Sequence, residues 1–312
     1  MPDVSVIIPT RNRWPLLSTR ALPSALAQEG VDHEVIVVDD GSSDETGTRL
    51  GLVDDERLSV VRRDPPNGLS RARNAGIAAA RGTWLAFLDD DDVWAPGKLR
   101  SQLAVARAEN ADLVYARTLA VDERGTVLHE LYLPEPEVLQ DQLDQACVVP
   151  AGCSNVIARA ELVRAEGCFD ERLSNLADWD LWIRLLRVGR AAVCRDVLVA
   201  YVLHAGNLHV VENPEGELDY LIRKHEEAAA PRHLVPDRVG YTRWVASQRS
   251  RAGLHRRAAG VYFRGAVAHR SVGDLARAVD ALLGKRLSAV GRPERRVGSD
   301  LEPPDWVRGF ES

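Results

Sequence analysis

The stretch TWLAFLDDDDVW, residues 83–94, joins an apolar run to four consecutive aspartates. The apolar run has the length and the continuous hydrophobicity of a buried strand in a parallel sheet. One or two aspartates at a strand end are commonly caps or turn residues. Four in a row indicate a bound positive charge, because each ionised carboxylate raises the pKa of its neighbours. Carboxylate oxygens suit a hard divalent cation, so we predict a Mg²⁺ or Mn²⁺ site at this strand end.

Short apolar runs alternate with helical patterns around this stretch. We expect strands at residues 4–9, 33–40, 58–62, 83–88 and 111–118. We expect helices at residues 15–28 with a bend at Pro23, from about 44, at 68–82 and at 96–110. This alternation predicts an α/β fold with a mainly parallel sheet that is covered on both faces. Ligands bind to such sheets at the carboxyl ends of the strands.

Polar residues also follow the first two expected strands at that edge. They are Pro9, Thr10 and Arg11 after the first strand, and Asp39 and Asp40 after the second. A carboxylate only accepts hydrogen bonds, so Asp39 suits the imide N–H of uracil or thymine. The alternative is a cap for the following helix, a role that we expect for Asp40 or for Asp44.

Two arginines lie on the helix expected at residues 68–82. The start of this helix points to the same edge of the sheet, so Arg73 is a candidate for contact with a diphosphate. The alternative, for Arg73 as for Arg71, is an ordinary solvated side chain on a helix surface.

The second half of the chain is less regular. We expect short elements at residues 126–150, a strand that runs into a helix at 154–163, a helix at 178–189 and one or two strands at 191–204. Asp178 opens the second of these helices, and two roles are open for it, the helix cap and a general base. His204 follows an apolar run, where a histidine is more often structural than a metal ligand.

The C-terminal part is helical and basic. Residues 231–312 contain 16 Arg or Lys and 8 Asp or Glu, so the formal net charge of −6 leaves −14 on the rest of the chain. We place a boundary at about 210–216, which predicts a main domain at 1–212, a helical module at 213–287 and a poorly ordered tail at 288–312. We expect the module to dock on the acidic body or to form a homodimer, in preference to binding a membrane.

Missing patterns exclude several classes of protein. No apolar run is long enough to cross a bilayer, and the start of the sequence does not read as a signal peptide. The four cysteines form no CxxC and no zinc pattern, so we expect free thiols in a reducing cytoplasm. No GxGxxG follows an expected strand and no P-loop is present, which disfavours dinucleotide-binding oxidoreductases and P-loop proteins.

Four motifs in this order resemble those of the family 2 glycosyltransferases: VSVIIPTRNR, VIVVDDGSSDET, GLSRARNAG and WLAFLDDDDVWAPGKL. The resemblance covers residues 4–117 closely and continues more weakly, through GCFDERLSNLADWDLWIRL, to His204. It implies the GT-A fold, a Rossmann-like sheet flanked by helices, with a nucleotide-binding half at about 1–118 and an acceptor half at about 119–212. It also implies a nucleotide-diphospho-sugar donor and a divalent metal.

The resemblance further implies roles in donor binding. Asp39 would read the base, and the strand-end segment of Pro9, Thr10 and Arg11 would pack on it. Arg73 resembles the arginine that lies near the diphosphate in this family.

Within the aspartate cluster, Asp89 and Asp91 match the outer residues of the family's DXD motif. Asp91 would then ligate the metal, and Asp89 or Asp90 would hold the ribose. Asp178 matches the catalytic base of inverting members, and His204 matches a histidine that often completes the metal site.

The sequence also departs from the family pattern. The usual Glu-Asp pair before the DLWIRL helix is Ala177-Asp178 here, so the base is present without its partner. The membrane helices and the QxxRW motif of processive synthases are absent from the sequence, which indicates transfer of a single sugar.

We therefore expect a hexosyltransferase-like, inverting enzyme that uses Mn²⁺ or Mg²⁺. Its donor would be a UDP- or dTDP-sugar, and its acceptor a hydroxyl on a glycan, a lipid-linked molecule or a small natural product. The alternatives are a non-catalytic nucleotide-sugar-binding scaffold and, less favoured, a sugar nucleotidyltransferase. We expect no nucleic-acid partner and a cytoplasmic location, with peripheral attachment to the inner face of the membrane as an option.

Overall fold

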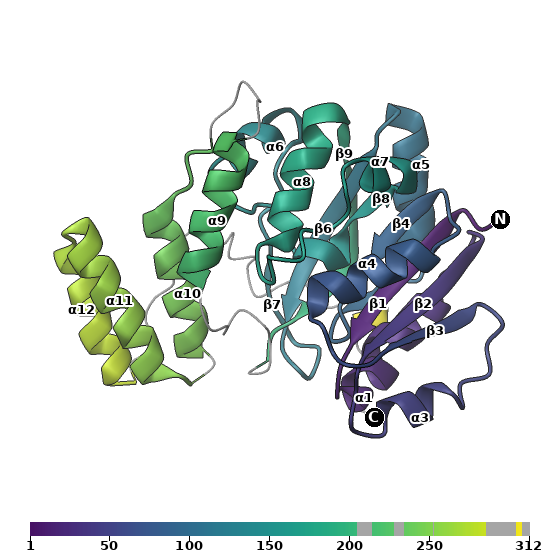
Figure 1. The fold of residues 1–312 in the computed structure, drawn as a ribbon, viewed down its shortest axis with the longest axis horizontal. Coiled ribbons are helices and arrows are strands. Elements are labelled where there is room, and N and C mark those ends of the chain that lie inside the picture. The colour runs from purple at the N-terminus through teal and green to yellow at the C-terminus, as the bar shows by residue number, and fades with distance from the viewer. Residues whose placement is uncertain (205–213, 228–233, 252, 285–303, 308–312) are drawn as a thin grey trace. The chain divides into compact units, whose positions relative to one another are not determined.

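The computed structural model describes residues 1–204, 214–227, 234–251, 253–284 and 304–307. The chain divides into two compact units (Figure 1). The sheet unit comprises residues 1–143, 147–202 and 294–312, and the helical unit comprises residues 144–146 and 203–293. The boundary expected at about 210–216 falls largely on residues outside the described part, so the predicted domain limits stay a prediction.

One nine-stranded sheet forms the centre of the sheet unit. Its strands are β1 (Val4–Thr10), β2 (His33–Asp40), β3 (Leu58–Arg63), β4 (Trp84–Phe87), β5 (Val93–Trp94), β6 (Leu113–Val121), β7 (Val127–Glu130), β8 (Ile157–Arg159) and β9 (Ala191–Val202). Their order is β3-β2-β1-β4-β8-β6-β9-β5, with β7 paired to β6. Strands β1 to β4 are mutually parallel and β6 is parallel to β9, whereas β8 runs antiparallel to both β4 and β6. The predicted mainly parallel α/β sheet is confirmed.

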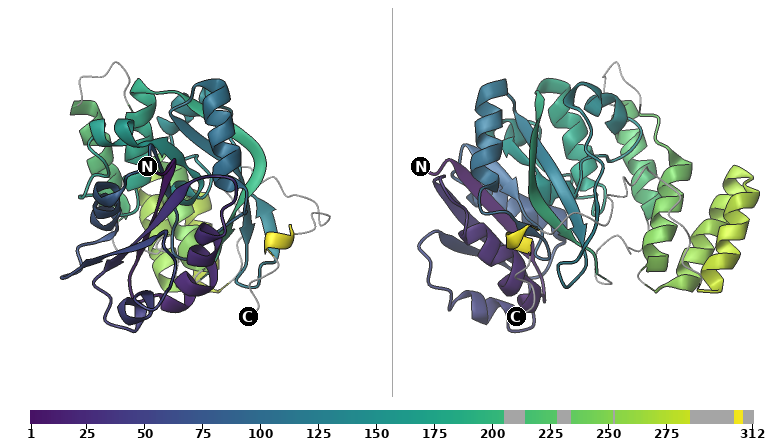
Figure 2. Two further views of the ribbon diagram at one scale, coloured as in Figure 1. Left: turned by 90° about the vertical axis from the view of Figure 1, so that its right-hand side faces the viewer. Right: turned by 180° about the vertical axis from the view of Figure 1, so that it is seen from behind.

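Helices cover both faces of this sheet. They are α1 (Trp14–Leu16), α2 (Leu22–Leu26), α3 (Thr46–Leu50), α4 (Leu69–Ala79), α5 (Lys98–Glu109), α6 (Pro136–Leu143), α7 (Ala160–Ala165) and α8 (Ala177–Val188). Figure 1 shows α4 and α8 on the side of the sheet that faces the viewer, and Figure 2 shows α5 on the opposite side. Every residue of β1 and β2 is buried as a result, which explains their continuous β-branched sequences.

The helix expected at residues 15–28 differs from the prediction. Helices α1 and α2 are joined by a π-helical turn at Leu17–Ala21, and Pro23 lies in the first turn of α2 rather than at a bend. Proline lacks a backbone N–H and its ring clashes with the carbonyl four residues earlier. A wider turn directly before the proline accommodates both defects without breaking the helix.

The helical unit contains α9 (Pro214–Glu227), α10 (Arg238–Arg251), α11 (His255–His269) and α12 (Val272–Leu282). Helices α10, α11 and α12 lie side by side in both figures, and their shared core includes Val245, Val261 and Tyr262. None of the helices within the described ranges is long and apolar enough to cross a membrane.

The tail expected at residues 288–312 contains one ordered element where the structure describes it. A 3₁₀ turn at Asp305–Val307 packs on the sheet unit, and Val307 is fully buried against Val93, Leu119 and Val202. Residues 288–303 and 308–312 lie outside the described part.

Candidate active site

The sheet order brings the polar strand ends together. Strand β1 lies between β2 and β4, and Thr10 at the end of β1 is paired in register with Asp39. Pro9 is buried within β1, whereas Arg11 is exposed just beyond the strand. The aspartates at residues 89–92 follow β4 at this same edge, so the predicted donor-side residues converge on one end of the sheet.

Arg13 bridges two aspartates of the cluster. Its Nη1 donates to Asp90 Oδ1 at 2.9 Å and to Asp91 Oδ2 at 3.0 Å, and Thr10 Oγ1 donates to Asp90 Oδ2 at 2.7 Å. Burial and the charge of Asp91 nevertheless raise the pKa of Asp90 to about 7. Arg13 therefore does not fully offset the cost of an ionised Asp90 that is buried beside Asp91.

Asp92 lies deeper than its neighbours and is fully buried. Its Oδ1 accepts a hydrogen bond from the Val202 backbone N–H at 2.9 Å, and its Oδ2 is a buried oxygen without a hydrogen-bond partner. Burial, together with the charges of Asp91 and Asp89, raises the pKa of Asp92 well above its ordinary value.

These residues fit a divalent cation that is shared with a substrate. Excess buried carboxylate charge and an orphaned buried oxygen are what a cation would offset. Among the described residues no three His, Cys, Asp or Glu side chains form a group that could hold a metal ion. Mg²⁺ sites, however, commonly use one or two carboxylates together with water and substrate phosphates. His204 belongs to the helical unit, so its role as a ligand, like that of Asp91, stays a prediction.

Arg73 on α4 points into the same edge. Its guanidinium is only 4% exposed, and Nη2 donates to Asp89 Oδ1 at 2.6 Å. The backbone N–H of Asp89 donates to Ser154 Oγ at 3.1 Å, which ties the cluster to the turn before β8. The predicted diphosphate arginine and the predicted ribose aspartate are thus ion-paired with each other.

Asp178 lies in the first turn of α8, beside the turn that contains Ser154. Leu176 is the N-cap residue of α8, but Asp178 Oδ1 still accepts from the backbone N–H of Trp179 at 2.7 Å, so Asp178 bonds a free N–H of the first turn without being the N-cap itself. Burial raises the pKa of Asp178 to about 6, and the nearby positive charge of Arg73 opposes that rise. A carboxylate with this pKa is largely ionised at pH 7 and is a stronger base than an ordinary aspartate.

Gly152 makes room for this carboxylate. A Cβ atom at Gly152 would lie 2.5 Å from Asp178 Oδ2, and the residue has a φ of +49°. Cys147 approaches the same oxygen, with its Sγ at 4.0 Å. The segment between α6 and β8 therefore forms one wall around Asp178.

Asp39 is fully buried and both of its oxygens are engaged. Oδ1 accepts from the Ser42 backbone N–H at 2.9 Å, and Oδ2 accepts from Arg62 Nη1 at 2.5 Å. The Arg62 side chain is 50% exposed, so it covers Asp39 from the solvent side. A base that bonded Asp39 Oδ2 would compete with Arg62 for this oxygen.

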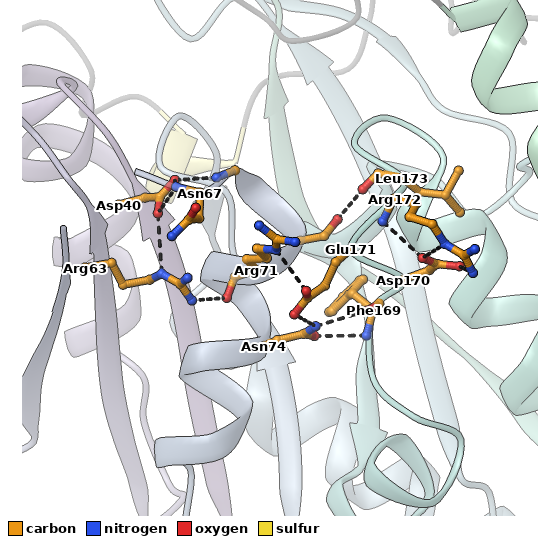
Figure 3. Close-up of polar contacts among 12 residues, drawn as sticks. Asp40, Arg63, Asn67, Arg71, Asn74, Phe169, Asp170, Glu171, Arg172 and Leu173 are labelled. Carbon is orange, nitrogen blue, oxygen red and sulfur yellow. Dashed lines mark hydrogen bonds and ion pairs between the residues drawn. The ribbon is translucent and has the colours of Figure 1, made fainter. Parts of the chain in front are cut away.

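The two neighbouring aspartates have structural contacts. Asp40 accepts from the backbone N–H groups of Asn67 and Gly68 and so fixes the loop before α4 (Figure 3). Asp44 Oδ1 accepts from the Thr46 backbone N–H at 2.9 Å at the start of α3. The N-cap residue of α3 is Glu45, so neither aspartate is the expected N-cap: Asp44 bonds the first backbone N–H of α3 from one residue before the cap, and Asp40 fixes the start of a different helix.

A set of contacts joins α4 to the loop before α8 (Figure 3). Asn74 Nδ2 donates to the Phe169 carbonyl and the Phe169 N–H donates to Asn74 Oδ1, both at 3.0 Å. Arg71 Nε donates to Glu171 Oε2 at 2.8 Å, so this arginine is paired rather than simply solvated. These contacts fix the loop that leads into α8, and so to Asp178, against the helix that carries Arg73.

Comparison with known proteins agrees with this arrangement. The model of the family described as glycosyl transferase family 2 matches residues 5–161, half of the chain. The chain belongs to glycosyl transferase family 2. Among the curated proteins similar to this chain, the succinoglycan biosynthesis protein ExoO of Rhizobium meliloti is 43% identical over 36% of this chain and 32% of its own length. An uncharacterized glycosyltransferase of Rickettsia prowazekii is 32% identical over 65% of each chain.

Other similar proteins have more specific names. The UDP-Glc:alpha-D-GlcNAc-diphosphoundecaprenol beta-1,3-glucosyltransferase WfgD of Escherichia coli is 27% identical over 59% of this chain and 70% of its own. The structure of S. aureus TarS 1-349 in complex with UDP-GlcNAc superposes with a TM-score of 0.61, at 18% identity, over 89% of this chain and 81% of that chain. This likeness concerns the fold alone. The chain spans about a third to two thirds of the length of the first curated relatives that it matches.

Several residues at this family 2 site were not predicted from the sequence. They are Arg13, Arg62, Gly152, Ser154 and Tyr201. Burial and the charges of Asp92 and Asp91 raise the pKa of the Tyr201 phenol, which places Tyr201 beside the cluster. Arg13 carried a signal that could have been used, because PTRNRW contains a second arginine two residues after Arg11.

Proposed function

We propose that this chain is a metal-dependent inverting glycosyltransferase that moves a single sugar from a UDP- or dTDP-sugar to a hydroxyl acceptor. The observation that carries the proposal is a series of charged contacts that links Asp178 to the aspartates at the end of β4. Asp178, with a pKa of about 6, lies in the field of Arg73, which is bonded to Asp89 at the start of the acidic cluster. A general base and a donor-binding edge are thus held in one network.

The donor would bind across the ends of β1, β2 and β4. Asp39 would accept a hydrogen bond from the N–H of uracil or thymine once Arg62 has moved aside, and residues 9–11 would pack on the base. Asp89 or Asp90 would hold the ribose. The uridine donor is supported by the UDP-Glc named for WfgD and for WfaP.

Proton transfer would belong to Asp178. In an inverting reaction the acceptor hydroxyl attacks the anomeric carbon from the face opposite the nucleotide, and a base takes its proton during the attack. Arg73 keeps Asp178 ionised at neutral pH by opposing the effect of its burial. A bound Mg²⁺ or Mn²⁺, held by Asp91 and His204, would neutralise charge on the departing diphosphate.

A lipid-linked glycan is the acceptor that we favour among those open to this chain. The names of WfgD and of the similar WfaP state a diphosphoundecaprenol-linked acceptor for those two proteins. The turn around Gly152 and the side chain of Cys147 border the Asp178 carboxylate, so they would contact the acceptor.

The test is a transfer assay with UDP-sugars and Mn²⁺, together with calorimetric binding of UDP. Asp178→Asn should abolish transfer and donor hydrolysis while the UDP affinity survives. Glu161→Gln, an exposed carboxylate in the first turn of α7, serves as the control and should change neither. UDP binding without any turnover by the wild type would favour the scaffold, and pyrophosphate release from UTP and a sugar phosphate would favour a nucleotidyltransferase.

A further inference from the structure

Helix α12 exposes a continuous apolar stripe to solvent. Val272, Leu275, Val279 and Leu282 are 82%, 45%, 51% and 59% exposed. They follow one another at intervals of three, four and three residues, so they share one face of the helix. The opposite face, with Ala278 and Ala281, is buried in the helical unit. An exposed stripe of this size is uncommon on a protein surface that has no partner.

Helix α11 adds a mixed stripe of apolar and cationic residues. Phe263 and Val267 are 54% and 67% exposed and lie one helical turn apart. Arg256 is also exposed and lies seven residues, or two helical turns, before Phe263, on the same side of α11. Arg270 is exposed as well and is the C-cap residue just past the end of α11, with a φ of 52°. One arginine therefore shares the side of the apolar pair and another follows the end of the helix.

The acidic side chains of these two helices are turned away from solvent. Asp274 is 2% exposed and is bonded to Arg243 at 2.8 Å and to Arg277 at 2.6 Å. Asp280 is only partly exposed. In the described residues from 255 to 282, the exposed charged side chains are all arginines: Arg256, Arg257 and Arg264 in α11, and Arg270 between α11 and α12.

We propose that α11 and α12 dock on an anionic lipid surface. The apolar stripe of α12 would enter the boundary between headgroups and acyl chains, and the exposed arginines of α11 would contact lipid phosphates. A second copy of the chain fits less well, because a self-complementary contact would bring these arginines toward one another. Apolar side chains flanked only by cations match a surface that is both apolar and negatively charged.

This inference does not rest on the proposed function, since lipid binding requires neither donor nor acceptor. It would nevertheless bring the site to the surface on which a lipid-linked acceptor is presented. It also departs from the expectation that the basic module docks on the acidic body or dimerises in preference to binding a membrane.

The test is co-sedimentation of the full chain with vesicles of phosphatidylcholine, with and without phosphatidylglycerol. The wild type should bind the anionic vesicles, release from them at high salt, and bind the neutral vesicles weakly. A Leu275→Asp and Val279→Asp double variant should lose at least tenfold in vesicle affinity. The matched control is Leu52→Asp with Leu128→Asp, two apolar residues of the sheet unit that are 74% and 48% exposed, and it should bind like the wild type.

A second variant tests the proposal even if the stripe variant fails to fold. Arg256→Gln with Arg257→Gln leaves the apolar stripe intact and should weaken binding to anionic vesicles alone. Failure of the wild type to bind anionic vesicles, or equal binding of the control and stripe variants, would overturn the proposal. A dimer in light scattering that the stripe variant dissociates would also overturn it in favour of a second copy. UDP-sugar hydrolysis without vesicles should be the same in the wild type and the stripe variant, which keeps this test separate from that of the proposed function.

Discussion

Arg73 Nη2 donates to Asp89 Oδ1 at 2.6 Å, and this ion pair joins helix α4 to the acidic end of β4. The sequence assigned the two residues to different parts of a donor, the diphosphate and the ribose. In the structure the positive charge of Arg73 acts on Asp89 and on Asp178 together. One buried guanidinium therefore interacts electrostatically with residues on both sides of the site.

Replacing Arg73 should shift the pH dependence of turnover. Arg73 lowers the pKa of Asp178, so in Arg73→Met this pKa should rise from about 6 by roughly one unit or more. The midpoint of the acid limb of the kcat/KM profile should move to higher pH by the same amount. Arg71→Met removes an exposed arginine that is paired with Glu171, and it should leave the limb in place. If the acid limb of the Arg73→Met profile stays at the same pH, the ionisation of Asp178 does not limit kcat/KM.

Asp178→Asn should stabilise the fold at alkaline pH. The pKa of Asp178 is raised from 3.8 to about 6, so folding favours the neutral carboxyl. The stability that the neutral carboxyl contributes is fully present below pH 4 and is lost as the pH rises through 6. Asparagine resembles the neutral form, so the variant should gain up to about 3 kcal/mol in the free energy of unfolding at pH 8. Urea denaturation at pH 8 and pH 5 checks this, with the gain at pH 5 expected to be roughly half as large. A gain that does not depend on pH would contradict the raised pKa.

Asp39 and Arg62 should differ in their effects on nucleotide affinity. If Asp39 reads the base, Asp39→Asn should weaken UDP binding at least ~10-fold, because an amide N–H would face the base N–H. Arg62→Gln removes only the half-exposed side chain that covers Asp39, and it should leave the affinity within about threefold or improve it. Calorimetry with UDP distinguishes the two variants. Equal losses would mean that the ion pair is structural and that Asp39 does not read the base.

Gly152→Ala should impair catalysis without impairing nucleotide binding. The new Cβ would lie 2.5 Å from Asp178 Oδ2, so the carboxylate must move, and kcat should fall at least ~10-fold. Gly167 has a φ of +79° and nothing within 4 Å of a built Cβ, so Gly167→Ala carries the same kind of backbone strain without the contact. Steady-state kinetics of the two variants should differ in kcat. Equal kcat values would show that the position of Asp178 does not matter.

Much of the fold could be predicted because the parallel strands are buried on both faces. β2 was predicted with its observed bounds and β1 within one residue, since their continuous β-branched runs have no other good interpretation. β5 and β7 were missed. They contain two and four residues and depend on pairing with β9 and β6, which local sequence does not reveal.

The site was predicted only where its residues follow strand ends. The aspartate cluster and Asp39 have that position, and strand order alone brings them together. Arg13 was missed because its contact with the cluster depends on Asn12, which adopts a left-handed conformation with a φ of 54° and so sets the direction of the chain after β1. Ser154 and Gly152 were missed because their contacts depend on β8 entering the sheet antiparallel beside β4, a pairing across more than 60 residues.

Titration of UDP into the full chain, with Mn²⁺ and with a chelator, tests the central claim most directly. If the acidic strand ends bind a cation that in turn binds the diphosphate, the wild type should bind UDP tightly only with Mn²⁺, and Asp91→Asn should bind it weakly in both conditions. UDP affinity that is equal with and without Mn²⁺, or unchanged in Asp91→Asn, would contradict the account.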